Sequence, residues 1–431
     1  MLEDLRGKRL ALMGTENGAD EVSRICESSG ITLVSFGSKA EAKIHKVSDE
    51  QCVVDCTDPD VMLPLLKEKK IDGVFLCTSE KVIRACSKYL HEAKMPFYTT
   101  LQQWDTLMNK KTFKEYAKQF GISTAPAYDL DEIERTVSEH KVSFPVVVKP
   151  SDSCGSVGIS ICNNIEEIRN AVRSATQHSL SNTVICEKYL ADDGAFFQFE
   201  VWIRDGKAFF PYVKQRIFYD RVGTSPKQPF IDIAPAFCIE LIKKYYYKQI
   251  EALFRDIGVN NGHCWFQGII DDGIPYLFDT GFRLGGGKDY SVTKKEKGID
   301  LIECYIRFAL TGQFGANLER LEAPFAHSYA VISVGLKNGL IKEIHGIDEI
   351  RNKDYVYDYY QYYQEGQVMT RCGIYAQALC RIYIQADNIT ELKRDVAEVM
   401  NLIEVKNEYG ESIILDLPSD YKRWIQDSNM Q

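Results

Sequence analysis

The clearest chemical candidate in the chain is a lysine followed by a turn of small residues. The segment from Phe144 to Gly158, FPVVVKPSDSCGSVG, predicts an apolar strand, then Lys149, then a turn rich in glycine and serine. Backbone N–H groups in such a turn can converge on phosphate oxygens, and the Lys149 ammonium would add a positive charge beside them. The spacing is not that of a Walker A loop. Taken alone, the segment is better explained by an exposed lysine before a β-turn.

A second candidate is the acidic residue in CEKYL, at the end of an apolar strand. An adenine ring needs an apolar slot, one acceptor for its amino group, and backbone groups for its ring nitrogens. Glu187 and the backbone of Lys188 to Leu190 could supply these. By itself, the motif is better explained by a strand end carrying a solvated Glu-Lys pair.

The third candidate is a hairpin, HCWFQGIIDDGIPYLFDTGF, which the Asp272-Gly273 turn predicts. Gln267 and Asp279 lie twelve positions apart, so an antiparallel hairpin brings them opposite each other. Two oxygen ligands facing one point suit magnesium, and an ordinary polar cross-strand pair is the equal alternative. Arg283 and a triple glycine follow. An arginine fork can hold a carboxylate or stabilise an oxyanion.

These candidates need elements that position them, and the pattern of the chain supplies several. The first hundred residues alternate short apolar runs with helical periodicity, which predicts a parallel sheet with helices on both faces. The predicted strands are RLALMG, TLVSFG, CVVDC, GVFLC and MPFYTT. A second hairpin is predicted at Asp205-Gly206, and the tail after about residue 325 is mostly strand-like, with a final strand and helix.

Composition limits the classes of function. The chain has 431 residues, 45% hydrophobic and 26% charged, with a net charge of -9 and no basic block, so a nucleic-acid surface is not expected. No apolar run approaches the roughly 20 residues that span a bilayer, so no membrane role is expected. The 13 cysteines are scattered without metal-type pairing, which favours reduced thiols and a cytoplasmic protein.

Taken in order, these motifs resemble the ATP-grasp superfamily, in particular bacterial L-amino acid ligases, biotin carboxylase and carbamoyl-phosphate synthetase. NKKTFKEYAKQFGISTAPAY resembles the family's first lysine helix, CEKYL its adenine hinge, and the hairpin with FDTGFRLGGG its metal site. The resemblance implies an α/β fold: an N-terminal parallel-sheet pre-ATP-grasp domain, an ATP-grasp fold, and a C-terminal β-rich module. The implied divisions are 1–105, 106–190 (small subdomain), 191–325 (large subdomain) and 326–431.

The resemblance also implies roles for single residues. Gln267 and Asp279 match metal-ligand positions, and Arg283 matches the catalytic arginine. The residues expected to bind the nucleotide are Lys110, Lys149, Ser153, Gly155, Ser156, Gly158, Glu187, Lys188 and Leu190. The chain departs from the family pattern at four positions. Asn109 stands where aspartate is usual, Phe196 where a ribose-binding glutamate is frequent, Asp279 is a shortened glutamate, and Gly281 replaces a metal-binding asparagine.

The function implied is an ATP-dependent carboxylate–amine ligase, which forms an amide through an acyl phosphate and releases ADP and phosphate. ATP and Mg²⁺ are the expected cofactors, with Mn²⁺ as an alternative metal. The expected partners are a small carboxylate and an amine, with a homodimer as the default assembly. Two other functions stay open: a bicarbonate-activating enzyme of the carboxylase or carbamoyl-phosphate synthetase kind, and an ATP-binding regulator without turnover.

Overall fold

The structure is a computed structural model, and it describes residues 2–14, 18–76, 78–152, 157–179, 181–190, 196–220, 227–370 and 377–426. Its first unit is a parallel sheet in the order β3-β2-β1-β4. Residues Leu10 to Met13 of β1 are fully buried, as expected for a strand covered on both faces. The elements of this unit are η1 (Glu3–Leu5), β1 (Arg9–Met13), α1 (Ala19–Ser29), β2 (Thr32–Gly37), α2 (Lys43–Lys46), β3 (Glu50–Val53), α3 (Pro59–Glu68), β4 (Gly73–Leu76) and α4 (Glu80–Tyr89).

The prediction of a fifth strand at MPFYTT is wrong. Residues 95–100 form no strand and lead into helix α5 (Leu101–Met108). Thr100 caps that helix through a capping box with Gln103, which the pattern of apolar residues does not show. The Tyr98 ring packs edge-on against Phe282, and its hydroxyl donates to the Phe282 carbonyl at 3.2 Å. The apolar residues of this segment therefore join the first unit to the end of the hairpin that turns at Asp272-Gly273, rather than extending the sheet.

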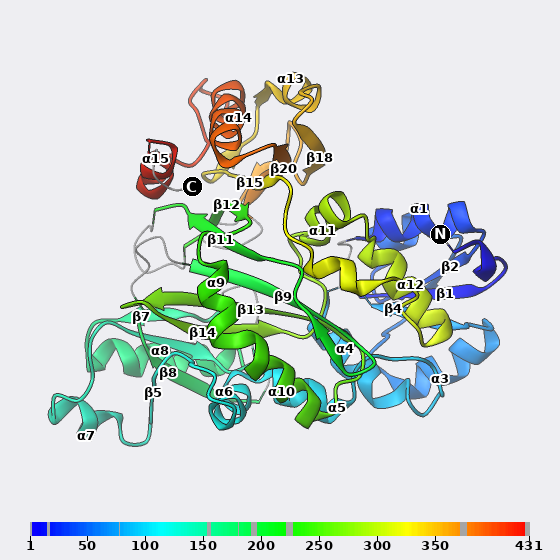
Figure 1. The fold of residues 1–431 in the computed structure, drawn as a ribbon, viewed down its shortest axis with the longest axis horizontal. Helices are drawn as coiled ribbons and strands as arrows, with labels where there is room; N and C mark the ends of the chain where they lie inside the picture. Colours follow the sequence, from blue (N-terminus) through cyan, green and yellow to red (C-terminus); the bar gives the residue numbers. More distant parts are fainter. Residues whose placement is uncertain are drawn as a thin grey trace.

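A small antiparallel sheet with the order β5-β8-β6-β7 follows helix α6 (Lys110–Gln119). Its apolar side chains and those of two helices form a separate hydrophobic cluster that includes Val146, Val148 and Ile168. In Figure 1 this unit lies beside the α7 and α8 labels, at the edge of the central sheet. Its elements are β5 (Ala127–Tyr128), α7 (Ile133–Ser138), β6 (Val146–Pro150), β7 (Ser160–Cys162), α8 (Ile165–Gln177) and β8 (Val184–Lys188).

The central antiparallel sheet runs β14-β13-β9-β11-β12-β15-β20-β18, with β10 paired to β9, within the described part of the chain. Both predicted hairpins are confirmed: Asp205 and Gly206 have φ of 52° and 76°, and Asp272 and Gly273 have 50° and 75°. Positive φ at both central residues is the signature of a type I′ turn, a common two-residue hairpin connection. The strands are β9 (Phe196–Arg204), β10 (Lys207–Phe209), β11 (Val213–Phe218), β12 (Pro229–Ala234), β13 (Gly262–Asp271) and β14 (Ile274–Gly281).

Helices cover this sheet and connect it to the first unit. α12 packs against β4 and β1 of the parallel sheet, and the carbonyl of Ala309 lies where a side chain on Gly73 would sit. One hydrophobic core therefore runs from the first unit into the central sheet. The covering elements are α9 (Ile239–Ile242), the π-helical turn η2 (Lys243–Tyr247), α10 (Lys248–Ile257), α11 (Tyr290–Lys297), α12 (Leu301–Thr311) and η3 (Leu318–Glu322).

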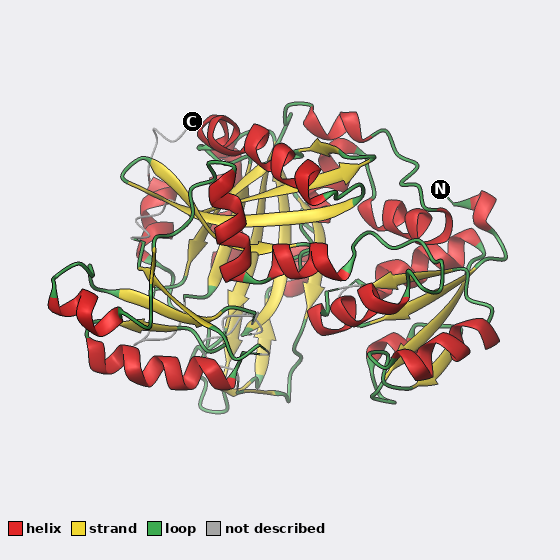
Figure 2. Ribbon diagram, turned by 90° about the horizontal axis from the view of Figure 1, so that it is seen from below, coloured by secondary structure: helices red, strands yellow, loops and turns green. Residues whose placement is uncertain are grey.

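Three strands of the tail extend the central sheet, because β15 pairs with β12, β20 with β15 and β18 with β20. Two further pairs of tail strands, β16-β19 and β17-β21, form small sheets of two strands each. Figure 2 shows the long central sheet between the two smaller units. Figure 1 shows α14 and α15 near the part of this sheet that β12, β15 and β20 form. The predicted α/β fold class is confirmed. The tail elements are β15 (Ser328–Gly335), β16 (Gly339–Leu340), β17 (Glu343–His345), α13 (Ile347–Arg351), β18 (Val356–Gln361), β19 (Val368–Met369), β20 (Ala378–Ala386), α14 (Ile389–Leu402), β21 (Glu404–Lys406) and α15 (Ser419–Gln426).

Candidate functional site

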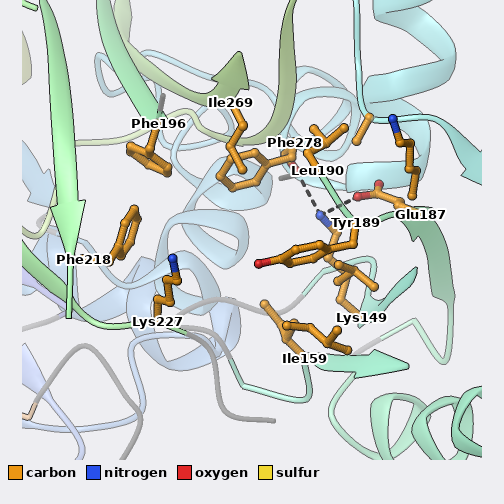
Figure 3. Close-up of a pocket in the computed structure, with 14 residues that line it drawn as sticks. Lys149, Ile159, Glu187, Tyr189, Leu190, Phe196, Phe218, Lys227, Ile269 and Phe278 are labelled. Carbon is orange, nitrogen blue, oxygen red and sulfur yellow. Dashed lines mark hydrogen bonds and ion pairs between the residues drawn. The ribbon is translucent and has the colours of Figure 1, made fainter. Parts of the chain in front are cut away.

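A cavity of about 200 Å³, here called the first cavity, lies between the small sheet and the central sheet (Figure 3). Four of the residues expected to bind a nucleotide line it: Lys149, Glu187, Lys188 and Leu190. Its walls are mainly apolar, as a planar aromatic base requires. The remaining lining residues are Ala125, Val147, Ile159, Ile161, Tyr189, Phe196, Phe218, Lys227, Ile269 and Phe278.

Lys149 and Glu187 are buried, so neither the exposed lysine nor the solvated Glu-Lys pair describes them. Lys149 is 4% exposed and Glu187 is 2% exposed. The Lys149 ammonium lies 2.9 Å from Glu187 Oε2 and donates to the Phe278 carbonyl at 3.1 Å. The register of β6 against β8 explains the approach, because Val147 pairs with Glu187 and Lys149 follows two residues later on the same face.

A second lysine, Lys114 on α6, also forms an ion pair with Glu187, and it was not expected from the sequence. It lies one helical turn after Lys110 and is 8% exposed, with its ammonium 3.1 Å from the Ala125 carbonyl. Burial would raise the pKa of Glu187, but the charges of Lys149 and Lys114 outweigh it and hold that pKa below its ordinary value. Burial lowers the pKa of Lys114 to about 8, against the opposing effect of the Glu187 carboxylate.

The other residues expected to bind the nucleotide differ in what the structure shows of them. The Lys188 side chain pairs with Asp271 at 2.8 Å, and its N–H donates to the Pro126 carbonyl, so this N–H is already used. Within the described residues the Leu190 N–H has no hydrogen bond, which leaves it available at the cavity wall. Gly158 precedes β7. Ser153, Gly155 and Ser156 lie outside the described residues.

A second cavity, of about 370 Å³, adjoins the first and shares Phe196, Phe218, Lys227 and Phe278 with it. It brings together the candidates from the hairpin, namely Gln267, Asp279 and Arg283. It also contains the triple glycine. The other residues that line it are Thr78, Gln198, Arg216, Gln228, Pro229, Trp265 and Asp289.

Gln267 and Asp279 are a directly opposed cross-strand pair, as the hairpin predicted. Gln267 donates through Nε2 to Gln198 at 3.0 Å, and no described residue donates to its Oε1, which could therefore act as a ligand. Asp279 Oδ1 lies 3.0 Å from the Lys110 ammonium. No cluster of three or more His, Cys, Asp or Glu side chains placed for a metal occurs in the described ranges. The two oxygen donors that face one point across the hairpin could hold a hard cation, with its other oxygens coming from phosphates.

Arg283 faces the first unit. Its Nε and Nη2 both donate to Glu80 Oε1, at 3.0 and 2.8 Å, and its guanidinium lies 5.3 Å from the centre of the Trp265 ring. Glu80 is the first residue of α4 and precedes Arg283 by 203 positions, so the sequence gives no sign of this pair.

Gly281 pairs directly with Trp265 across the hairpin. A Cβ atom built on Gly281 would lie 2.1 Å from Cζ2 and 2.2 Å from Cε2 of the indole. The position where the family carries asparagine is thus filled by a tryptophan ring from the neighbouring strand. A side chain at position 281 therefore does not fit while Trp265 keeps its place.

The triple-glycine turn is held from the tail. Arg381 Nη1 donates to the Gly286 carbonyl and the Tyr383 hydroxyl to the Gly287 carbonyl, both at 3.1 Å. In a trans peptide the carbonyl and the following N–H point in opposite directions. Strand β20 therefore fixes the orientation of the peptide groups in a turn that lines the second cavity.

A buried charge network supports the floor of the second cavity. The Lys214 ammonium lies 2.9 Å from Asp232 and 2.7 Å from Asp289, and Arg216 donates to Asp232 from two nitrogens. Burial would raise the pKa of Asp232, but Arg216 and Lys214 hold it well below the ordinary value. Gln198 donates to Asp289 at 3.2 Å and so links this network to Gln267.

Comparison with known proteins shows similarity to one protein family, to several relatives and to solved structures. Residues 109–318 match the family described as carbamoyl-phosphate synthase L chain, ATP binding domain. The chain is 24% identical over 315 residues to the 2-oxoglutarate carboxylase small subunit of Hydrogenobacter thermophilus, covering 68% of this chain and 64% of that protein. It is 29% identical over 284 residues to the carbamoyl phosphate synthase large chain of Clostridium beijerinckii, covering 64% of this chain and 25% of that protein. The chain thus spans less than two thirds of either relative.

Solved structures share the fold at lower sequence identity. The L-amino acid ligase from Bacillus licheniformis superposes with a TM-score of 0.76 at 17% identity, covering 94% of this chain and 99% of that chain. The biotin carboxylase domain of the Hydrogenobacter thermophilus 2-oxoglutarate carboxylase, solved with magnesium ADP and bicarbonate, gives 0.72 at 18% identity, covering 93% and 90%. None of the helices in the described ranges is both long and apolar enough to pass through a bilayer.

Proposed function

Because the family match and the shared fold confirm the predicted resemblance to the ATP-grasp superfamily, we propose that this chain is an ADP-forming carboxylate–amine ligase. The observation that carries the proposal is the pair of adjoining cavities. One has apolar walls and a buried lysine-carboxylate pair, and the other collects Gln267, Asp279 and Arg283. A nucleotide in the first cavity would direct its terminal phosphate towards a carboxylate in the second.

In this reaction a carboxylate oxygen attacks the γ-phosphorus of ATP, the bond to the β-γ bridging oxygen breaks, and ADP leaves. The nitrogen of the amine then attacks the acyl carbon, and inorganic phosphate departs as the amide forms. The proton lost by the amine leaves with the phosphate or the solvent. No covalent enzyme intermediate is needed, so none of the cysteines is required as a nucleophile.

Each expected site residue has a binding role in this reaction. Lys149 and Lys110 bind phosphate oxygens, which requires each to give up part of its present ion pair with Glu187 or Asp279. Arg283 binds the substrate carboxylate in competition with Glu80. Glu187 accepts from the amino group of adenine, and the Leu190 N–H serves a ring nitrogen. Ser153, Gly155, Ser156 and Gly158 cover the phosphates.

Gln267 Oε1 and Asp279 would hold Mg²⁺, with Mn²⁺ as the alternative metal. The ion, when bound, neutralises charge on the phosphates. We also propose that domains and subdomains divide after residues 105, 190 and 325, that the protein is cytoplasmic and that it forms a homodimer.

A bicarbonate-activating reaction is the second candidate, favoured by the carboxylase and carbamoyl phosphate synthase relatives. The two reactions share the acyl-phosphate step and differ in the carboxylate that attacks ATP. The third possibility, a regulator without turnover, would keep the nucleotide cavity and lack substrate-dependent ADP release.

The test is a screen for ADP release with amino acids and other carboxylates, each with and without amines, followed by mass analysis of the products. The ligase predicts release that needs both a carboxylate and an amine, and a stable amide as the product. Turnover driven by bicarbonate alone, or with a biotinylated carrier protein, would replace the ligase with the second candidate. Nucleotide binding without ADP release on any substrate would leave the regulator.

A further inference from the structure

The buried Glu187 carboxylate forms ion pairs with two lysines, although only one of them can reach a ligand in the first cavity. Lys114 and Lys149 approach different oxygens of the same carboxylate, Oε1 and Oε2. Lys149 lines the first cavity, whereas Lys114 lies behind Glu187 and does not line it. Figure 3 shows the Lys149 ammonium directed at Glu187 within the cavity. One lysine is therefore placed to reach a ligand, and the other is not.

The proposed function requires Lys149 to turn towards phosphate oxygens when a nucleotide binds. A carboxylate that is 2% exposed would then lose one of its two counter-ions. A buried charge left without a partner is strongly unfavourable, so a protein with Lys149 alone would oppose its departure. Lys114 removes this conflict, because it is anchored to the Ala125 carbonyl at 3.1 Å and stays behind Glu187.

The state of Glu187 also decides which base fits. An ionised carboxylate only accepts hydrogen bonds, so it matches the 6-amino group of adenine. The 6-oxo group of hypoxanthine or guanine presents an oxygen at the same place, and two oxygens without a proton repel each other. A protonated Glu187 could donate to that oxygen, and the discrimination would be lost.

We propose that Lys114 is the permanent counter-ion of Glu187, which lets Lys149 move to the nucleotide phosphates and sets the preference of the pocket for 6-amino over 6-oxo purines. Lys114 is thus a positioning and specificity residue that acts through Glu187. The inference rests on the proposed nucleotide site. It would hold equally for the ligase, for the bicarbonate-activating enzyme and for a regulator, since all three use the first cavity.

The test is calorimetric titration of the full chain with ADP and with IDP, each with magnesium and without a carboxylate substrate, so that no turnover occurs. Wild type is expected to prefer ADP by roughly 10- to 100-fold, the range for one hydrogen bond to a charged group that IDP cannot make. Lys114→Met should weaken ADP binding by about 10- to 100-fold, the range for losing a hydrogen bond to a charged group, and reduce the ADP preference about tenfold. Lys118→Met, one turn further along α6 on an exposed side chain, is the matched control and should match wild type.

The double variant Lys114→Met/Glu187→Gln separates a local role from general damage. It removes both charges, so ADP affinity should recover most of the loss, while the preference over IDP stays low because an amide can donate as well as accept. Unchanged affinity and preference in Lys114→Met would overturn the proposal. So would an equal loss for ADP and IDP that the double variant does not recover, since that pattern indicates support of the fold only. A wild-type chain that binds neither nucleotide would refute the proposed function itself.

Discussion

Replacing Gly281 tests the contact with Trp265 without any knowledge of the substrate. A Cβ at this position would lie 2.1 to 2.6 Å from three atoms of the indole, so Gly281→Ala forces either the ring or strand β14 to move. Forced extra atoms in a packed site cost about 1–3 kcal/mol. If the ring leaves, the protein also loses the burial of a side chain that is 8% exposed and the platform under Arg283, which is worth about 0.5–2 kcal/mol. We therefore expect a destabilisation of about 3 kcal/mol.

The assay is thermal and urea unfolding followed by circular dichroism for wild type, Gly281→Ala, Trp265→Ala and the double variant. Trp265→Ala alone should cost about 3–5 kcal/mol, as is typical for truncating a buried tryptophan. Once the ring is gone, the three atoms nearest to the methyl group are gone with it, so the double variant should be about as stable as Trp265→Ala. Costs that simply add, or a Gly281→Ala protein as stable as wild type, would refute the assignment of this space to the indole.

The same contact changes what a metal-ligand swap can achieve. Gly281→Asn alone should not lower the magnesium requirement, because the amide cannot enter a space filled by the ring. Trp265→Thr/Gly281→Asn opens the space, and only this pair should lower the requirement for free magnesium in the ADP-release assay.

Three further predictions concern the two cavities. Lys149→Ala should reduce turnover by about two to three orders of magnitude, the scale for losing one preorganised charge, with near-normal folding because Lys114 still pairs with Glu187; unchanged turnover and ATP affinity would remove Lys149 from the site. Arg283→Lys should cost roughly 2–4 kcal/mol of transition-state stabilisation with nucleotide affinity nearly unchanged, measured as kcat/KM beside calorimetry, since lysine lacks the planar fork; full activity would contradict the role given to the arginine. ADP affinity should fall as pH rises through about 8, because Lys114 then loses the proton that pairs it with Glu187. The charges of Lys149 and Asp279 also act on the Lys114 ammonium. The fall in affinity should be absent in Lys114→Met, and a wild-type affinity that does not change with pH would contradict the prediction.

Local patterns predicted a good part of the fold. Four of the five strands expected in the first unit are present, and both Asp-Gly turns form the expected hairpins, because turn chemistry and strand periodicity act over a few residues. The opposition of Gln267 and Asp279 followed directly from the second turn. The segment MPFYTT misled because aromatic residues that pack between units look like a strand when seen without their partners. The roles expected for the site residues stay predictions.

Most partners of those residues could not be predicted, since they come from distant parts of the chain. Glu80 is 203 positions from Arg283, and Lys114 reaches Glu187 from a helix that precedes the small sheet. Trp265 and Gly281 are closer, but only the register of the hairpin shows that one fills the space of the other. The sequence around a lysine or a glutamate does not indicate with which oppositely charged residue its side chain will form an ion pair.

The ion pairs have a common consequence for the proposed chemistry. Lys149, Lys110 and Arg283 each hold an acidic partner inside the site, namely Glu187, Asp279 and Glu80. The charges that should receive phosphates and a carboxylate are thus neutralised before substrates bind, which limits the cost of burying them. Each substrate group must then compete with a protein carboxylate. Part of its binding free energy therefore offsets the loss of an existing ion pair, instead of arising from contact with an unpaired cation. The site therefore favours ligands that engage all three cations together, and a nucleotide triphosphate beside a carboxylate meets that condition.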